Sequence, residues 1–331
     1  MRIASVSKPI TAAGILKLVE DGKLSLDAPA MALLPEIQSP NGTVADKRFN
    51  DVTIRQLLQH AGGWNRDTTF DPMFEPSRVA NALDIPKPPN SQAIIRYMLT
   101  QPLQFNPGTD TVYSNFGYTI LGRVIEKVSG MRYDSYIKTN ILKPAGITRM
   151  QLGGSLLKDR VKDEVVYYDY PDAPIAAAVF PGEGNVPMPY GGFYIEAMDS
   201  HGGWIASPIE LLRFVNSLEG RTQPPILQPA SIQQMLAQPT APYAQGKPAF
   251  YALGWNVRPT NNNATWWHNG SLPGTSSIMV RAYSGITWAA IFNSRPQNFN
   301  AFNGELDTSL WNALNGATAL PNHDLFSTYS K

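Results

Sequence analysis

The sequence contains no cysteine among its 331 residues and only four histidines, His60, His201, His268 and His323. The first absence excludes disulfides, thiolate catalysis and metal sites built on cysteine. The histidines are scattered and form no His-Glu-x-x-His pattern, so we expect neither a metal centre nor a cofactor that depends on one. A chain without cysteine suits oxidising and reducing compartments equally, so its localisation stays unknown at this stage.

Charge and long apolar runs are also scarce. Charged residues make up 16% of the chain, the formal net charge is +1 and no long basic run occurs, which argues against a nucleic-acid partner. No apolar run approaches the roughly 20 residues that a membrane helix needs, so we expect no membrane span. The first residues lack a charged start followed by an apolar core and a cleavage site, so we expect no signal peptide in this chain.

The hydrophobic pattern predicts helices through most of the chain and strands near its end. Residues 5–21 repeat apolar side chains at helical spacing and stop at Gly22. Further helices are predicted over residues 53–63, 91–101, 115–130, 132–146, 207–220, 229–239 and 301–316. Strands are predicted over residues 251–257, 264–270, 276–283 and 287–294. Residues 160–204 are rich in Pro, Gly and Tyr without a period, which predicts a long ordered loop of the kind that is often functional.

This order of elements predicts the α+β class. A sheet domain is expected from residues 1–55 and 205–331, with the first helix at its interface. Residues 56–204 are expected to form a mostly helical domain that includes the long loop 160–204. With 331 residues, 43% of them hydrophobic, the chain is long enough to bury a large core, as one domain or as two interleaved ones.

Ser5 and Lys8 are one helical turn apart where the first predicted helix begins. A serine hydroxyl becomes a nucleophile when a neighbour takes its proton, and a helix N-terminus favours the negative charge that develops. A lysine can take the proton only if burial or nearby cations lower its pKa from about 10.4. The pair predicts a serine nucleophile with a lysine base, although a helix cap with a surface lysine fits the same pattern. The spacing also recurs at Ser135 with Lys138 and at Ser155 with Lys158.

Tyr113-Ser114-Asn115 is a second candidate motif, which opens a predicted helix. A tyrosine there can accept or relay a proton, and an asparagine can orient a lysine and bind a substrate amide. Taken alone, the motif fits an ordinary core tyrosine at a turn better. The motif therefore gains weight only together with the others.

A third candidate motif, His268-Asn269-Gly270-Ser271, lies late in the chain among the predicted strands. A glycine on a strand lets a ligand backbone approach closely, and the N–H of the next residue can help to form an oxyanion hole. His-x-Gly also occurs at His60 and His201, but only His268 falls on a predicted strand.

In this order, "SVSK" (5–8), "YSN" (113–115) and "HNG" (268–270) resemble the serine β-lactamase and penicillin-binding protein superfamily. The likeness is closest to its class C-like, β-lactamase-related branch of esterases, D-peptidases and β-lactamases, and it covers roughly residues 2–295. "FNPGTDTVYSNFGYTILGRVIEKVSG" and "HGGWIASPIELLRF" also resemble segments of that branch. The resemblance implies a β-lactamase/transpeptidase-like fold, an antiparallel sheet flanked by helices plus a mostly helical domain. It also implies a hydrolase that needs no metal or cofactor.

The resemblance implies a catalytic role for Ser5, Lys8 and Tyr113 and a substrate-binding role for Asn115. Ser5 would be acylated, and Lys8 would accept its proton. Tyr113 would be the partner base that later activates water, while Asn115 would orient Lys8 and the substrate.

Three further residues would bind the substrate if the resemblance holds. His268 stands where many relatives carry the lysine of Lys-Thr-Gly, and Gly270 would let the substrate lie along the strand. The N–H of Ser271 would form the oxyanion hole together with the N–H of Ser5.

The chain departs from the family pattern in two places. Relatives carry several dozen residues before the Ser-x-x-Lys motif, whereas four precede Ser5 here. We therefore expect a shortened form that lacks the usual N-terminal strands. Alternatively, a homo-oligomer or another element covers the sheet edge that would otherwise be exposed. A neutral His268 is a weaker anchor for a carboxylate than lysine, which favours neutral small esters over β-lactams. The loop 167–204 with Trp266 and Trp267 is expected either to wall an apolar acyl pocket or to be simply core.

Two other serine chemistries lack their motifs. No Gly-x-Ser-x-Gly elbow occurs, which argues against an α/β-hydrolase, and the class A Ser-Asp-Asn signature is missing. The leading hypothesis is a carboxylesterase or β-lactamase-like serine hydrolase whose partner is a small ester, amide or β-lactam. A D,D-peptidase or D-aminopeptidase and a non-catalytic, shortened binding module remain as alternatives.

Overall fold

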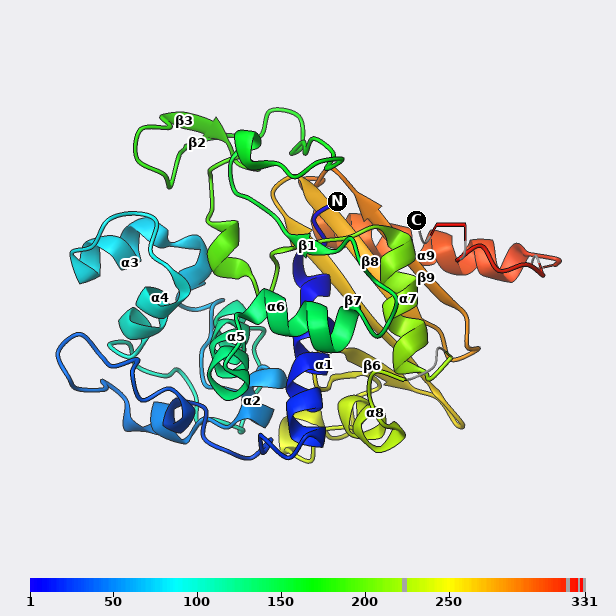
Figure 1. Ribbon diagram of the computed structural model, residues 1–331, viewed down its shortest axis with the longest axis horizontal. Helices are drawn as coiled ribbons and strands as arrows, with labels where there is room; N and C mark the ends of the chain where they lie inside the picture. The colour runs from blue at the N-terminus through cyan, green and yellow to red at the C-terminus, as the bar shows by residue number, and fades with distance from the viewer. Residues whose placement is uncertain (222–224, 320–321, 327, 330–331) are drawn as a thin grey trace.

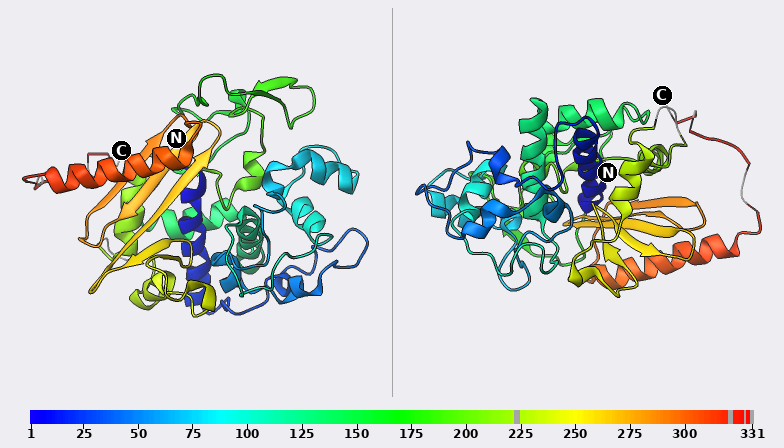
Figure 2. Two further views of the ribbon diagram at one scale, coloured as in Figure 1. Left: turned by 180° about the vertical axis from the view of Figure 1, so that it is seen from behind. Right: turned by 90° about the horizontal axis from the view of Figure 1, so that it is seen from below.

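The computed structural model describes residues 1–221, 225–319, 322–326 and 328–329. A five-stranded antiparallel sheet lies between helices on its two faces, and a mostly helical body stands beside it (Figures 1 and 2). The α+β class predicted from the sequence is confirmed. Within the described residues, every helix is too short or too polar to cross a lipid bilayer.

Most helices come before the large sheet in the sequence, and α9 follows it. The helices are α1 (Ser7–Glu20), α2 (Ile54–Leu58), α3 (Pro76–Leu83), α4 (Ser91–Met98), α5 (Asn115–Ser129), α6 (Tyr133–Ile137), α7 (Pro208–Leu218), α8 (Pro229–Leu236) and α9 (Phe299–Gly316). The large sheet has the order β5 (Phe250–Tyr251), β6 (Asn256–Pro259), β7 (Ala264–Leu272), β8 (Thr275–Arg281) and β9 (Thr287–Phe292). Two small antiparallel pairs are β1 (Gln151–Leu152) with β4 (Trp204–Ile205) and β2 (Ile175–Ala177) with β3 (Asn185–Pro187).

α1 is the helix that joins the sheet to the helical body. Every residue from Ser7 to Leu16 is buried, and the helix contacts α5, α6 and α8. Figure 1 shows it running between the sheet and the helices α2 to α6. Pro9 falls in the first turn, where its missing N–H removes no helical hydrogen bond. Because α1 is covered on all sides, a lysine in its first turn has no direct route to solvent.

α9 covers the opposite face of the sheet, as the view from behind shows (Figure 2). Trp311 packs edge-on against Trp288, with ring centroids 4.9 Å apart, and Phe302 packs against Phe292 at 5.3 Å. These aromatic contacts fix the C-terminal helix to strand β9.

The strand predicted over 251–257 is wrong as a single element. It consists of β5 and β6, which pair with each other antiparallel around a turn. Gly254 makes that turn with φ of 86°, and a Cβ there would lie 2.6 Å from the Cβ of Ala12 in α1. Glycine is therefore needed both for the turn and for its close packing on α1.

The region 160–204 is ordered, but it is not free of regular structure. It contains the hairpin of β2 with β3 and a 3₁₀ turn at Ile195–Met198. Arg2 attaches it to the start of the chain, since its buried guanidinium donates to the carbonyl oxygens of Pro189 at 2.7 Å and Gly154 at 2.8 Å. The sequence pattern did not indicate this contact.

One predicted helix needs correction, and one helix was missed. α2 ends at Leu58, well short of residue 63, because the backbone turns at His60 with φ of 60°. α3 was not predicted at all, although Pro76 occupies its first position. The remaining predicted helices are present with ends shifted by a few residues, α6 continuing as a π-helical turn at Lys138–Leu142.

Candidate active site

Ser5 lies in a 3₁₀ turn, Ala4–Val6, that leads directly into α1. The preceding Ala4 has φ of 48°, a left-handed conformation that costs an alanine on the order of 1 kcal/mol. Strand β7 packs tightly on this turn, because a Cβ at Gly270 would lie 2.5 Å from the oxygen of Ile3 and 3.0 Å from the nitrogen of Ser5. Gly270 thus brings the strand against the backbone of the serine, a closer constraint than the predicted contact with substrate.

The amine of Lys8 is fully buried and contacts three oxygen atoms. Its Nζ lies 3.1 Å from Ser5 Oγ, 2.8 Å from Asn115 Oδ1 and 3.1 Å from the carbonyl oxygen of His201. The amide and carbonyl oxygens can only accept hydrogen bonds. A neutral amine donates its two protons to those oxygens and turns its lone pair to the hydroxyl of Ser5.

The environment of Lys8 disfavours its charged form. Burial holds the pKa of the amine well below its ordinary value of 10.5, and the positive charge of Arg66 acts in the same direction. The negative charge of Asp71 opposes both effects. The lysine is therefore a neutral base over more of the pH range than a surface lysine would be.

Tyr113 lies over the amine of Lys8, whose Nζ is 4.6 Å from the centre of the phenol ring. The imidazole of His60 packs against the same ring, with centroids 4.3 Å apart. Burial raises the pKa of Tyr113, and a hydrogen bond with Ser5 only partly offsets this. Tyr113 is consequently a phenol at neutral pH.

His268 lies on β7 and is buried, with 1% of its surface exposed. Its Nδ1 is 2.7 Å from the carbonyl oxygen of Asn269, which can only accept, so Nδ1 carries the proton. Its Nε2 is 2.9 Å from the hydroxyl of Tyr251 and accepts from it. Burial, aided by the charge of Lys8, lowers the pKa of His268 to about 3. The residue is a neutral imidazole and supplies no cation.

A cleft of about 300 Å³ opens above Ser5. Tyr113 and Asn115 line its helical side, and Asn269 and Ser271 line its sheet side. The structure thus brings residues from the start, middle and end of the chain to one cleft, with Lys8 and His268 buried beside it.

The apolar walls of this cleft are not the ones that the sequence suggested. They come from Phe74, Leu272 and Phe299. Trp266 instead packs edge-on against Trp255 at 4.6 Å, and Trp267 packs on Arg258. From the loop 167–204, His201 and Gly202 line the cleft. Neighbouring residues on a strand face opposite sides, so Trp266 is core as the second alternative had it, whereas Trp267 is half-buried on the other face of the strand.

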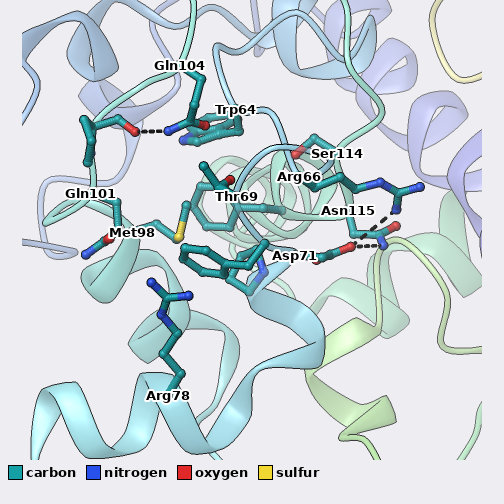
Figure 3. Close-up of a pocket in the computed structure, with 14 residues that line it drawn as sticks. Trp64, Arg66, Thr69, Asp71, Arg78, Met98, Gln101, Gln104, Ser114 and Asn115 are labelled. Carbon is teal, nitrogen blue, oxygen red and sulfur yellow. Dashed lines mark hydrogen bonds and ion pairs between the residues drawn. The ribbon is translucent and has the colours of Figure 1, made fainter.

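Arg66 and Asp71 are site residues that the sequence analysis missed. Figure 3 shows Asp71 between Asn115 and Arg66, at one end of a second pocket of about 260 Å³. The side-chain nitrogen of Asn115 donates to Asp71 Oδ2 at 2.7 Å, and Arg66 Nη1 lies 3.5 Å from the same oxygen. No motif in the sequence joins position 71 to position 115, so only the folded chain reveals the contact.

The other two Ser-x-x-Lys copies lie elsewhere and have structural partners. Ser155 is buried, accepts from the backbone nitrogen of Ile195 and donates to Glu196. Lys158 pairs with Glu183 at the surface, and Lys138 pairs with Asp134 at 3.3 Å. Neither copy offers a lysine in contact with its serine.

The fold and the cleft together define a class: an α+β protein with a serine–lysine pair where the sheet meets a helical body. The family model described as Beta-lactamase matches residues 1–307, and the chain belongs to that family.

Two curated relatives and one solved structure illustrate the likeness. The chain is 28% identical to penicillin-binding protein 4* of Bacillus subtilis (strain 168) over 84% of this chain and 57% of the relative. It is 27% identical to the lovastatin esterase of Penicillium rubens over 73% of this chain and 60% of the relative, so it spans less than two thirds of either relative. The fold is that of the D-amino acid amidase from Ochrobactrum anthropi SV3, with a TM-score of 0.69 and 23% identity over 95% of this chain and 84% of the amidase.

Proposed function

We propose that the chain is a serine hydrolase that forms an acyl-enzyme at Ser5. The observation that carries the proposal is the amine of Lys8, which is buried, has a lowered pKa and lies 3.1 Å from Ser5 Oγ. A serine activated by a neighbouring base attacks a carbonyl carbon and splits one difficult hydrolysis into two easier steps.

In the first step, Lys8 takes the proton of Ser5 while Oγ bonds to the substrate carbonyl carbon. The N–H groups of Ser5 and Ser271 would stabilise the negative oxygen that forms. The bond to the leaving group then breaks, and the proton held by Lys8 passes to that group, with Tyr113 as the relay. In the second step, water loses a proton to Lys8 and attacks the acyl carbon. The bond from that carbon to Ser5 Oγ then breaks, Lys8 returns the proton to Oγ, and the acid product leaves. Because Tyr113 is a phenol, it passes a proton on only when it receives one, so the activation of water that the resemblance implied for Tyr113 is assigned here to Lys8.

The electrostatics of the cleft favour a neutral small ester as substrate. His268 is uncharged and has both ring nitrogens engaged. Arg66 is the charged residue that lines the cleft, and Asp71 at 3.5 Å and Asp67 at 3.9 Å counter its charge. A substrate carboxylate therefore meets no unbalanced cation among the described residues around Ser5. The apolar walls formed by Phe74, Leu272 and Phe299 suit a short acyl chain.

The test combines covalent labelling with turnover. The folded protein is treated with a fluorophosphonate, and its intact mass is measured for wild type, Ser5→Ala and Ser155→Ala. We expect one adduct in wild type and in Ser155→Ala, and none in Ser5→Ala. Rates on p-nitrophenyl butyrate, nitrocefin and a D-Ala-D-Ala peptide are then compared, and we expect the ester to have the highest kcat/KM.

Two outcomes would favour the alternatives. Faster hydrolysis of the D-Ala-D-Ala peptide than of the ester would indicate a peptidase. Folded wild-type protein that takes up no label and turns over none of the three substrates would indicate a binding module without catalysis.

A further inference from the structure

Asp71 divides its two carboxylate oxygens between different partners. Oδ1 accepts from the backbone nitrogen of Met73 at 3.1 Å and caps the short 3₁₀ turn Pro72–Phe74. Oδ2 accepts from the side-chain nitrogen of Asn115 at 2.7 Å and faces Arg66 at 3.5 Å (Figure 3). The carboxylate is mostly buried, with 14% of its side chain exposed.

These contacts leave the amide of Asn115 only one orientation. A carboxylate accepts hydrogen bonds and donates none, so the Asn115 atom that faces Asp71 has to be the nitrogen. The amide oxygen then faces Lys8, whose Nζ lies 2.8 Å away. If the Asn115 amide were turned over, its N–H groups would face the N–H groups of Lys8, and no hydrogen bond would form between the two donors. Asp71 thus determines which atom Lys8 meets.

We propose that Asp71 is a positioning residue of the hydrolytic reaction, holding the Asn115 amide oxygen on the base Lys8, with Arg66 as the counter-charge that limits its effect on that base. The inference rests on the proposed function, since it assigns a task to Asp71 only if Lys8 activates Ser5. It concerns a residue that does not reach the substrate and acts through Asn115.

The groups around Lys8 leave Asp71 and Arg66 as the charges that tune it. Burial lowers the pKa of His60, His201 and His268, so the three imidazoles stay neutral at and above neutral pH. Burial raises the pKa of Tyr113, Tyr118 and Tyr251, so the three phenols stay protonated there. The remaining contacts of Lys8, Ser5 and Asn115, do not titrate in this range. Asp71 raises the pKa of Lys8 and Arg66 lowers it.

Asp71→Asn is the first variant. Its side-chain oxygen can keep the cap on Met73, so the turn survives, but its other atom becomes an N–H donor that faces Asn115. The Asn115 amide then turns over, and Lys8 loses one of its two oxygen acceptors, keeping the carbonyl oxygen of His201. We expect kcat to fall about 10- to 100-fold, since a misplaced catalytic group costs about that much. The acidic limb of the kcat/KM profile should move to lower pH, because a negative charge near Lys8 is gone.

Arg66→Gln is the second variant, and it shifts the profile the other way. Removing the cation that lowers the pKa of Lys8 moves the acidic limb to higher pH, while Asp71 continues to orient Asn115. Asp67→Asn is the matched control. It removes the same charge from the same loop, but its side chain is 76% exposed and, among the described residues, forms an ion pair only with Arg66, at 3.9 Å. We expect its profile to follow wild type.

Opposite shifts in the two variants, with the control unchanged, support the inference, because a merely structural residue has no reason to produce them. An Asp71→Asn profile equal to wild type, shifts of equal sign, or an Asp67→Asn profile equal to that of Asp71→Asn would overturn it. If Asp71→Asn does not fold, Arg66→Gln against Asp67→Asn still decides: an upward shift in the first alone supports the inference, and its absence overturns it. Wild-type protein that neither labels at Ser5 nor hydrolyses ester removes the proposed function, and this inference with it.

Discussion

Burial favours the uncharged form of the titratable residues around this cleft. Lys8 is drawn toward the neutral amine, His268 is kept as a neutral imidazole, and Tyr113 remains a phenol. In each case burial is the largest cause, because a low-dielectric surrounding penalises the charged form. Perturbed pKa values that gather around one serine are typical of a site built for proton transfer rather than for stability.

The buried amine has a consequence for stability that can be measured apart from activity. The pKa of Lys8 is lowered in the folded state and ordinary, 10.5, in the unfolded chain. Between these two values the unfolded chain binds more protons, so this residue makes the free energy of unfolding rise with pH, by at most about 1.4 kcal/mol per pH unit. Lys8→Met lacks the effect. We therefore expect the Tm of wild type minus that of Lys8→Met to increase between pH 7 and pH 10, measured by calorimetry. Parallel Tm curves would contradict it.

At the scale of elements, the site depends on how closely β7 packs on the turn that carries Ser5. Gly270 allows this approach, and Ser277 of β8 holds the same turn by donating from its hydroxyl to the oxygen of Ile3 at 2.7 Å. The nitrogen of Ser5, the proposed oxyanion donor, lies within this contact. Strand packing and catalytic geometry are therefore coupled at one glycine.

Gly270→Ala tests that coupling. The new Cβ would overlap the backbone at Ile3 and Ser5, so the strand and the turn have to separate. Overpacking of this kind costs about 1–3 kcal/mol, and we expect a lower Tm together with a fall in kcat of about tenfold or more. Gly304→Ala is the control, since that glycine lies in α9 and no atom of the described residues comes within 4 Å of an added Cβ. In this variant the free energy of unfolding should rise by about 0.5–1 kcal/mol, and kcat should stay unchanged. Loss of kcat in both variants, or in neither, would contradict the coupling.

Periodicity in the sequence predicted the elements whose side chains repeat over several turns or pleats. α1, α5 and α7 and the strands β7 to β9 are of this kind, and they are present. The sequence failed where a short segment depends on distant contacts, as in the split of β5 from β6 at Gly254 and in the helix α3. For the cleft, motif order indicated which residues meet, whereas Asp71 was invisible because its partner Asn115 is 44 positions away.

At the scale of the whole molecule, the cleft exists only where the sheet and the helical body meet. Ser5 comes from the 3₁₀ turn that leads into α1, Tyr113 from the segment just before α5 and Ser271 from β7. His60, His201 and His268, three of the four histidines, are buried in the same region. A change that charges these histidines should therefore destabilise the junction between the two parts of the fold.

Acid provides that change. The pKa of His60, of His201 and of His268 lies below its ordinary value of 6.5 in the folded protein, by burial first and by the charge of Lys8 second. Below pH 6.5 these histidines are protonated in the unfolded chain but stay neutral in the folded chain. The free energy of unfolding therefore falls as pH falls, by about 1.4 kcal/mol per pH unit for each such histidine. Urea unfolding at pH 7, 6 and 5 should show this loss.

The slope of the free energy of unfolding against pH shows which histidines cause the loss of stability. His201→Gln should reduce the slope by about one such contribution, whatever its own effect on stability at pH 7. His323→Gln, at an exposed position, should keep the wild-type slope. A slope unaffected by His201→Gln, or reduced equally by both substitutions, would place the acid-sensitive groups elsewhere. The expected pattern would mean that a histidine buried beside the serine and its base accounts for part of the stability that the fold loses in acid.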